Sequence, residues 1–137
     1  MRRSYTEIYL HLIWGTWDRL DLIHNSIEPI LYQYLRRKCE GHNCWLDEIG
    51  GTFDHVHLLI RLNSTITVGE LVKSLKGSSS HYIAQIHQPG FFFKWQDGYS
   101  AFSVSSFHIP KITKYIKNQK THHLNSSFIN DWELVLS

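Results

Sequence analysis

The sequence predicts one α+β domain in which helices back an antiparallel sheet. Two apolar periodicities alternate along the chain, one repeating at every second residue as in strands and one at every third or fourth residue as in helices. With 137 residues, 42% of them hydrophobic, the chain has the size and composition of a single domain with one core. We therefore expect one domain over residues 1–137.

The first strand and the first helix are predicted from the N-terminal third. Residues 5–17, YTEIYLHLIWGTW, distribute their side chains between two faces as a half-buried strand does. After a loop, we expect Ser26 to cap a helix that ends near Gly41, with Pro29 tolerated in the first turn.

A hairpin is predicted next. Residues 44–49 are apolar enough for a short strand, and we expect Gly50-Gly51 to break it. The stretch that follows, up to Leu62, reads as the third strand, so that the two strands pair. Its core face is formed by Val56, Leu58, Ile60 and Leu62.

A second helix and an aromatic loop come after the hairpin. Thr67 and Glu70 have the spacing of a capping box, which predicts a helix that runs to the Gln-Pro-Gly sequence at 88–90. Residues 91–99, FFFKWQDGY, form a loop whose rings are read either as core or as an exposed stacking surface.

The fourth strand and a last helix complete the order. Residues 101–107, AFSVSSF, read as a strand, and Pro110 suits the first turn of a helix that runs through His123. The order β-α-β-β-α-β fits a ferredoxin-like fold with an antiparallel four-stranded sheet. The last helix is additional to that core.

Two histidines of the third strand are candidate metal ligands. His55 and His57 leave a strand on the same side, about 7 Å apart at their roots. That separation allows both imidazoles to bind one ion. In a chain with ten histidines, the alternative is that the His-x-His pattern is a coincidence.

The last helix supplies a second candidate pair. Tyr115 and Gln119 are four residues apart and share a helix face. Together with His55 and His57 they offer a nucleophile and a His-His-Gln metal shell, which suits cleavage of a phosphodiester. A phenol has a pKa near 10, so the tyrosine requires activation. The alternative is that the pair is ordinary surface.

Charge is concentrated in one region. Between residues 64 and 124 there are seven lysines against Glu70 and Asp97, whereas the net charge of the whole chain is only +2. This distribution indicates an anion-facing surface, with an ordinary solvated helix face as the alternative. The candidate phosphate contacts are Lys73, Lys76, Lys111 and Lys114.

Four motifs, DHVHLLI, LVKSLKGSSS, WQDGYSAFSVS and YIKNQKTHH, occur in an order that resembles the HUH-type single-tyrosine transposases of small bacterial insertion sequences. The resemblance runs from about Tyr5 to Phe128. It implies a ferredoxin-like enzyme that cuts and rejoins single-stranded DNA through a covalent 5′-phosphotyrosine. It also implies that Tyr115 is the nucleophile and that His55, His57 and Gln119 bind the metal.

The resemblance extends to cofactor and partners. It implies a homodimer in which the tyrosine helix can complete the partner's site, and DNA hairpins at the element ends as substrate. The donor set suits Mg²⁺ or Mn²⁺, although zinc also suits imidazole, and no nucleotide cofactor is expected. Asp54 reads either as a group that holds a ligating histidine or as a turn residue.

Two other functions remain open. One is a replication or conjugation nickase of the wider HUH class, which the small size and the single tyrosine disfavour. The other is a non-catalytic nucleic-acid-binding module, a decayed or domesticated copy, that uses the lysine-rich helix and the aromatic loop as a charge and stacking surface. The short tail after Trp132, where relatives often continue, leaves open that this copy is decayed. No apolar run long enough for a membrane span and no signal peptide are evident, so we expect a cytoplasmic protein. Cys39 and Cys44 read as ordinary thiols.

Overall fold

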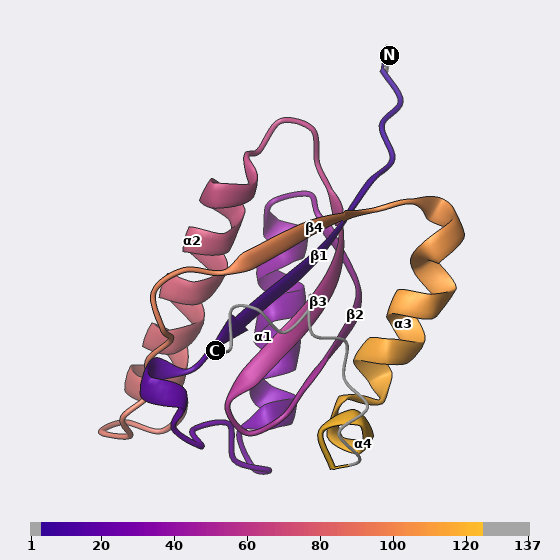
Figure 1. The fold of residues 1–137 in the computed structure, drawn as a ribbon. Helices are drawn as coiled ribbons and strands as arrows, with labels where there is room; N and C mark the ends of the chain where they lie inside the picture. The colour runs from indigo at the N-terminus through magenta and orange to yellow at the C-terminus, as the bar shows by residue number, and fades with distance from the viewer. Residues whose placement is uncertain (1–3, 125–137) are drawn as a thin grey trace.

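The structure is a computed structural model of the chain, and it describes residues 4–124. Four strands form one antiparallel sheet in the order β2-β3-β1-β4 (Figure 1). They are β1 (Ile8–Gly15), β2 (Trp45–Gly51), β3 (His55–Leu62) and β4 (Ser100–Val104). This is the predicted ferredoxin-like sheet, and the predicted fold class is confirmed.

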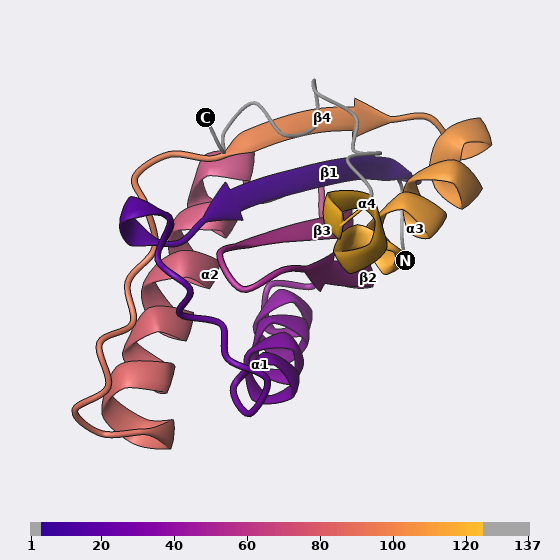
Figure 2. The ribbon, with the colours of Figure 1, turned by 60° about the horizontal axis from the view of Figure 1, so that its bottom comes forward.

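Helices cover both faces of the sheet (Figure 2). One face carries α1 (Glu28–Gly41) and α2 (Val68–His81), which continues as one π-helical segment, Tyr82–His87. The other face carries α3 (Ile109–Lys117) and α4 (Gln119–Leu124). Short 3-10 turns occupy Trp17–Arg19 and Ser106–His108.

The main core lies between the sheet and the α1–α2 layer. It includes Leu12 and Trp14 of β1, Leu58 and Ile60 of β3, and apolar side chains of both helices. A second, smaller cluster on the opposite face joins Leu59 to Ile112 and Ile116 of α3. Because β3 is covered on both faces, six consecutive residues, His55–Ile60, are buried.

The glycine pair does not break the second strand, contrary to the prediction. Gly50 and Gly51 are the last two residues of β2, and the turn is formed by residues 52–54. A Cβ atom on Gly50 would collide with the carbonyl oxygen of Ile116, so this glycine lets α3 approach the strand closely. The strand therefore continues up to the site described below.

Helix starts were predicted with mixed success. The capping box is confirmed, because the Thr67 hydroxyl accepts from the Glu70 amide at 3.1 Å and the Glu70 carboxylate accepts from the Thr67 amide at 3.3 Å. The Ser26 cap is wrong. The N-cap of α1 is Ile27, without a side-chain cap bond, and the amides of Ile27 and Glu28 donate to the carbonyl oxygen of His24.

The last part of the chain also departs from the prediction. The fourth strand ends at Val104, and the single expected helix is divided at Asn118, whose φ of −102° and ψ of 23° are not helical. The aromatic loop is mixed, with Phe93 and Trp95 buried and Phe92 exposed. Residues beyond 124 lie outside the described part of the chain.

Two further expectations concern cysteines and membranes. Cys39 and Cys44 are free thiols, and both are buried. Within residues 4–124, no helix has the length and apolar character needed to cross a bilayer.

Candidate active site

His55 and His57 lie on the face of β3 that α3 covers. Both are buried, with 1% and 0% of their surfaces exposed, and their ring centroids are 5.2 Å apart. Their burial follows from the two-sided cover of β3. The structure thus holds both imidazoles inside a small polar site between the sheet and the last two helices.

Hydrogen bonds orient His55 from two sides. Its Nδ1 lies 2.8 Å from Asp54 Oδ1 and 2.9 Å from Thr52 Oγ1, while its Nε2 lies 3.1 Å from Gln119 Oε1. An ionised carboxylate accepts a hydrogen bond from Nδ1–H, and in that tautomer Nε2 presents a lone pair. Nε2 and the amide oxygen then face each other, and each presents a lone pair. A cation that binds both atoms would remove the repulsion between these lone pairs.

Asp54 is itself held by Arg19. The guanidinium lies 2.9 Å from Asp54 Oδ1. Burial acts to raise the pKa of Asp54, but the hydrogen bonds from His55 and Arg19 outweigh it and keep the pKa below its usual value. Arg19 reaches this position from a turn in which Asp18 and Arg19 have φ angles of 52° and 53°, an unfavourable conformation for side-chain-bearing residues.

A third histidine, absent from the sequence-based set, supports His57. His11 Nε2 lies 2.9 Å from His57 Nδ1, and His11 is fully buried. In the β1–β3 register, His11 lies opposite Leu59, which makes it a diagonal neighbour of His57 on the same sheet face. The alternation of β1 places His11 on the face opposite Leu10 and Leu12, and this was the available signal in the sequence.

The last two helices bring the other predicted residues to the histidines. The Tyr115 ring of α3 lies 5.7 Å from the His57 ring at an angle of 74°. Gln119, the first residue of α4, also donates from Nε2 to the carbonyl oxygen of Tyr115 at 3.4 Å. Tyr115 is 5% exposed and Gln119 1%. The four predicted site residues therefore converge within one chain.

Packing and polar contacts hold these helices in place. Ile112 and Ile116 pack on Leu59, next to the histidines. Lys120 of α4 donates to Glu28 of α1 at 2.8 Å and to the carbonyl oxygen of Gly51 at 3.3 Å. The end of β2, the start of α1 and the last helix are thus joined at the edge of the site.

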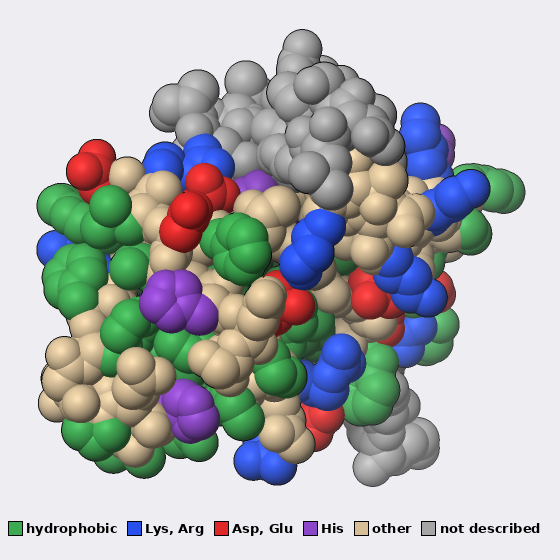
Figure 3. All heavy atoms as spheres, turned by 90° about the horizontal axis from the view of Figure 1, so that it is seen from below, with side chains coloured by type: hydrophobic (Ala, Val, Ile, Leu, Met, Phe, Trp, Pro, Cys, Tyr) green, Lys and Arg blue, Asp and Glu red, His purple; other side chains and the backbone are tan. Residues whose placement is uncertain are grey.

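The predicted phosphate contacts are divided between the two faces. Lys111 and Lys114 are exposed on α3, the helix that carries Tyr115, and basic side chains gather on the α3 and α4 side in Figure 3. Lys73 and Lys76 belong to α2 on the other face. Lys76 donates to the carbonyl oxygens of Gln96 and Gly98 at 2.7 and 2.8 Å, and burial lowers its pKa. A DNA role for these lysines stays a prediction.

The donor set fits a divalent ion. Among residues 4–124, no three histidine, cysteine, aspartate or glutamate side chains are grouped to hold a metal. The present set instead joins two imidazoles to a carboxamide oxygen. The 3.1 Å between His55 Nε2 and Gln119 Oε1 is short enough for both atoms to contact one ion.

Comparisons with known proteins show what the whole chain is similar to. Residues 4–119 match the family described as Transposase IS200 like. The crystal structure of a candidate transposase from Deinococcus radiodurans R1 is similar, with 28% identity, a TM-score of 0.67, and coverage of 87% of this chain and 95% of that chain. A REP-associated tyrosine transposase bound to a REP hairpin shares the fold, with 12% identity, a TM-score of 0.67, and coverage of 90% of this chain and 73% of that chain. No curated protein matches the chain.

Proposed function

The chain belongs to the IS200-like transposase family, and on this premise we propose that it is a metal-dependent HUH endonuclease that cuts and rejoins single-stranded DNA. One observation carries the proposal. His55, His57, Tyr115 and Gln119, which come from one strand and two helices, surround a single buried polar site. A merely structural cluster does not require a phenol beside two imidazoles and a carboxamide oxygen.

Tyr115 is the nucleophile in this proposal. Its phenolic oxygen, after losing its proton, forms a bond to the scissile phosphorus, and the bond from phosphorus to the 3′ oxygen breaks. The chain then carries a 5′-phosphotyrosine, and the 3′ oxygen leaves as a hydroxyl after taking up a proton. Attack by a 3′ hydroxyl on the phosphotyrosine reverses these steps and joins two strands. The phosphotyrosine conserves the energy of the broken bond, so no nucleotide cofactor is needed.

His55, His57 and Gln119 are the residues that would hold the ion. When bound, a divalent ion such as Mg²⁺ or Mn²⁺ polarises the phosphate and stabilises charge on the leaving oxygen. Asp54 and His11 fix the outer nitrogens of the two imidazoles, so that each Nε2 is the nitrogen available as a ligand. Arg19 keeps Asp54 ionised, which preserves this tautomer of His55.

The proposed substrate is single-stranded DNA from the ends of the element that encodes the chain, including hairpins. The similar REP-associated transposase was solved with a REP hairpin, which supports this substrate class. Of the four candidate phosphate contacts, Lys111 and Lys114 are the nearest to Tyr115 in the sequence, on the same helix α3. We also propose that the active form is a homodimer.

Covalent capture tests the proposal. Purified protein is incubated with labelled single-stranded oligonucleotides that carry the element ends, with Mn²⁺ or Mg²⁺, and the products are separated on a denaturing gel. We expect a covalent protein–DNA adduct that EDTA prevents and that Tyr115→Phe and His57→Ala abolish. Tyr99→Phe, which changes an exposed tyrosine outside the site, is the matched control and should leave the adduct unchanged.

Binding without any adduct would contradict the proposal. It would favour the alternative of a nucleic-acid-binding module that no longer cuts. An adduct that persists in Tyr115→Phe would show that another residue is the nucleophile.

A further inference from the structure

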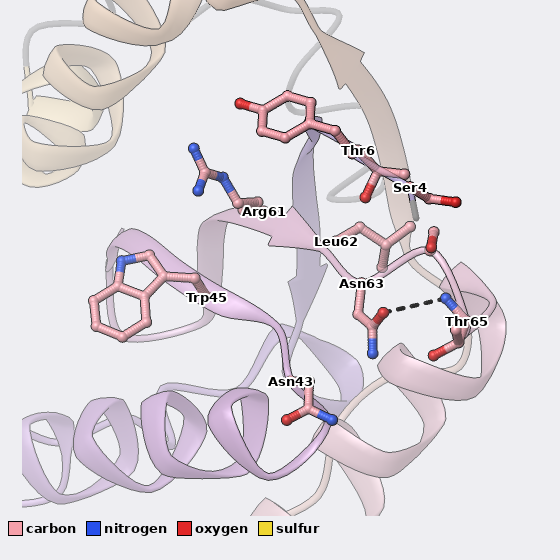
Figure 4. A pocket seen from close by; sticks show the side chains of 10 residues that line it. Ser4, Thr6, Asn43, Trp45, Arg61, Leu62, Asn63 and Thr65 are labelled. Atoms are coloured by element: carbon pink, nitrogen blue, oxygen red, sulfur yellow. Dashed lines mark hydrogen bonds between the residues drawn. The ribbon is translucent and has the colours of Figure 1, made fainter. Parts of the chain in front are cut away.

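A groove lies at the other end of β3 from the histidines. It has a volume of about 490 Å³ and lies between the segment before β1, the start of β2 and the loop after β3. Its lining includes Trp45, Arg61, Asn43 and Asn63 (Figure 4). From His55 to Arg61 the strand rises about 20 Å, so this groove is separate from the proposed cleavage site.

Trp45 and Arg61 form its wall. They are paired residues on neighbouring strands, and Figure 4 shows their side chains extending to the same side. The indole is 55% exposed, although it begins an edge strand where a smaller or polar residue would suffice. A single exposed tryptophan is common on protein surfaces, so the residues around it decide whether it can bind a ligand.

Arg61 is held in position by Tyr9 of the neighbouring strand β1. Its Nη2 donates to the Tyr9 hydroxyl at 2.7 Å, and its guanidinium lies 5.3 Å from the centroid of the Tyr9 ring. It also lies 4.0 Å from Glu7. A guanidinium held in this way keeps further N–H donors for a ligand at little additional entropic cost.

The charge of the groove favours a base over a phosphate. Glu7 lies beside Arg61, and Asp47, whose pKa is raised by burial against the opposing effect of Arg61, is also near. These carboxylates offset the guanidinium. The groove instead offers a flat aromatic face, directed N–H groups and the exposed amide of Asn43, which match the face and edge of an unpaired nucleobase.

We propose that this groove binds an unpaired nucleotide of the DNA, with its base stacked on Trp45 and its edge contacted by Arg61. The inference rests on the proposed function in that single-stranded DNA is the substrate. The groove adds a contact outside the site of cleavage, and the bound base lies remote from the scissile phosphate. Trp45 therefore contributes to DNA affinity and not to the chemical step.

Equilibrium binding tests the groove without any cleavage. The probe is a fluorescein-labelled dT20 strand in EDTA, followed by anisotropy, with protein variants first checked for unchanged melting temperature. Because stacking on an aromatic side chain contributes about 1–3 kcal/mol per base, Trp45→Ala should weaken binding about 5- to 150-fold. Trp45→Phe, which keeps an aromatic face, should restore most of the affinity.

Phe92→Ala is the matched control, because Phe92 is 54% exposed and belongs to the aromatic loop at 91–99. We expect it to bind dT20 like the unchanged protein. The proposal that the groove binds a nucleotide is overturned if Trp45→Ala binds dT20 normally, if the unchanged protein does not bind dT20, or if Phe92→Ala alone weakens binding. Crosslinking with 5-iododeoxyuridine in the same strand should label the peptide that contains Trp45.

The two proposals fail separately. If dT20 binding depends on Trp45 but no covalent adduct forms on element ends, the binding proposal is supported and the endonuclease proposal is contradicted. If Trp45→Ala binds dT20 normally while Tyr115 forms an adduct, the endonuclease proposal is supported and the binding proposal is contradicted.

Discussion

At the scale of single residues, the site consists of two imidazoles whose outer nitrogens are held by different partners. His55 has the ionised Asp54, which Arg19 supports, and His57 has the imidazole of His11. Partners of this kind fix ring orientation and tautomer, and their removal typically lowers metal affinity about 10- to 100-fold.

We predict that His11→Ala lowers the Mn²⁺ affinity of the site about 10- to 100-fold, because His57 Nδ1 loses its hydrogen-bond partner. The affinity is measured by titration calorimetry, and adduct formation is measured as a function of Mn²⁺ concentration. Added Mn²⁺ should restore adduct yield. His81→Ala, an exposed histidine of α2, is the control. A variant that only melts at lower temperature, with unchanged Mn²⁺ affinity, would assign His11 a purely structural role.

The buried thiols give a pH-dependent prediction. Burial, with a smaller contribution from Cys44, raises the pKa of Cys39 from 9.0 to about 12. The unfolded chain therefore loses this proton first, and the associated stability is complete below pH 9 and is lost as the pH rises towards 12. The free energy of unfolding in urea should fall by up to about 1.4 kcal/mol per pH unit more steeply for the unchanged protein than for Cys39→Ala. Parallel pH profiles would contradict this prediction.

At the scale of elements, periodicity predicted most of the fold, and long-range contacts explain what it missed. The capping box at Thr67 and the alternation of β1 and β3 depend on neighbours in sequence, so they were readable. The role of Gly50 depends on a carbonyl of α3, which no local pattern reveals.

The candidate site, like the fold, was predictable from the sequence only where it depends on short-range patterns. His55 with His57, and Tyr115 with Gln119, are short-range pairs within single elements. His11 contributes only through the register of β1 against β3, and Arg19 only through a turn with positive φ angles. Neither contact has a sequence signature of its own.

The close approach of α3 to β2 yields a prediction. Gly50→Ala should displace α3, because the new methyl group would collide with the Ile116 carbonyl oxygen. We expect a stability loss of about 1–3 kcal/mol and, since Tyr115 moves with the helix, an adduct yield lowered about 10-fold or more. Thermal melting and the adduct gel measure the two effects.

Gly77→Ala is the control for this substitution, because nothing lies within 4 Å of a Cβ atom there. In the interior of α2 it should stabilise the protein by up to about 1 kcal/mol. Full adduct yield in Gly50→Ala would mean that Tyr115 does not depend on this contact.

At the scale of the whole molecule, the two sheet edges differ. The order β2-β3-β1-β4 leaves β2 and β4 outermost. β2 carries Asp47 and Glu48 and a register shift between Leu46 and Glu48, which oppose edge pairing. β4, with the sequence SAFSV, has no charge, so the proposed dimer is expected to join through this edge.

A lysine on that edge should therefore favour the monomer. Ser103 is exposed in β4, and Ser103→Lys places a charge where two strands would pair. We expect the mass measured by light scattering to fall from that of a dimer towards that of one 16.2 kDa chain. Asn25→Lys, in an exposed turn, is the control. If Ser103→Lys remains a dimer, the prediction is contradicted and the dimer must form through a surface other than the β4 edge.

The order of the site residues along the chain has a consequence for synthesis. The sheet that carries both histidines is complete by Val104, whereas Tyr115 and Gln119 follow it. Domains generally fold as units, with N-terminal segments leaving the ribosome first. The histidines and the residues that orient them are thus synthesised before the tyrosine, and the site gains its reactive group only when the helices after β4 pack on the sheet.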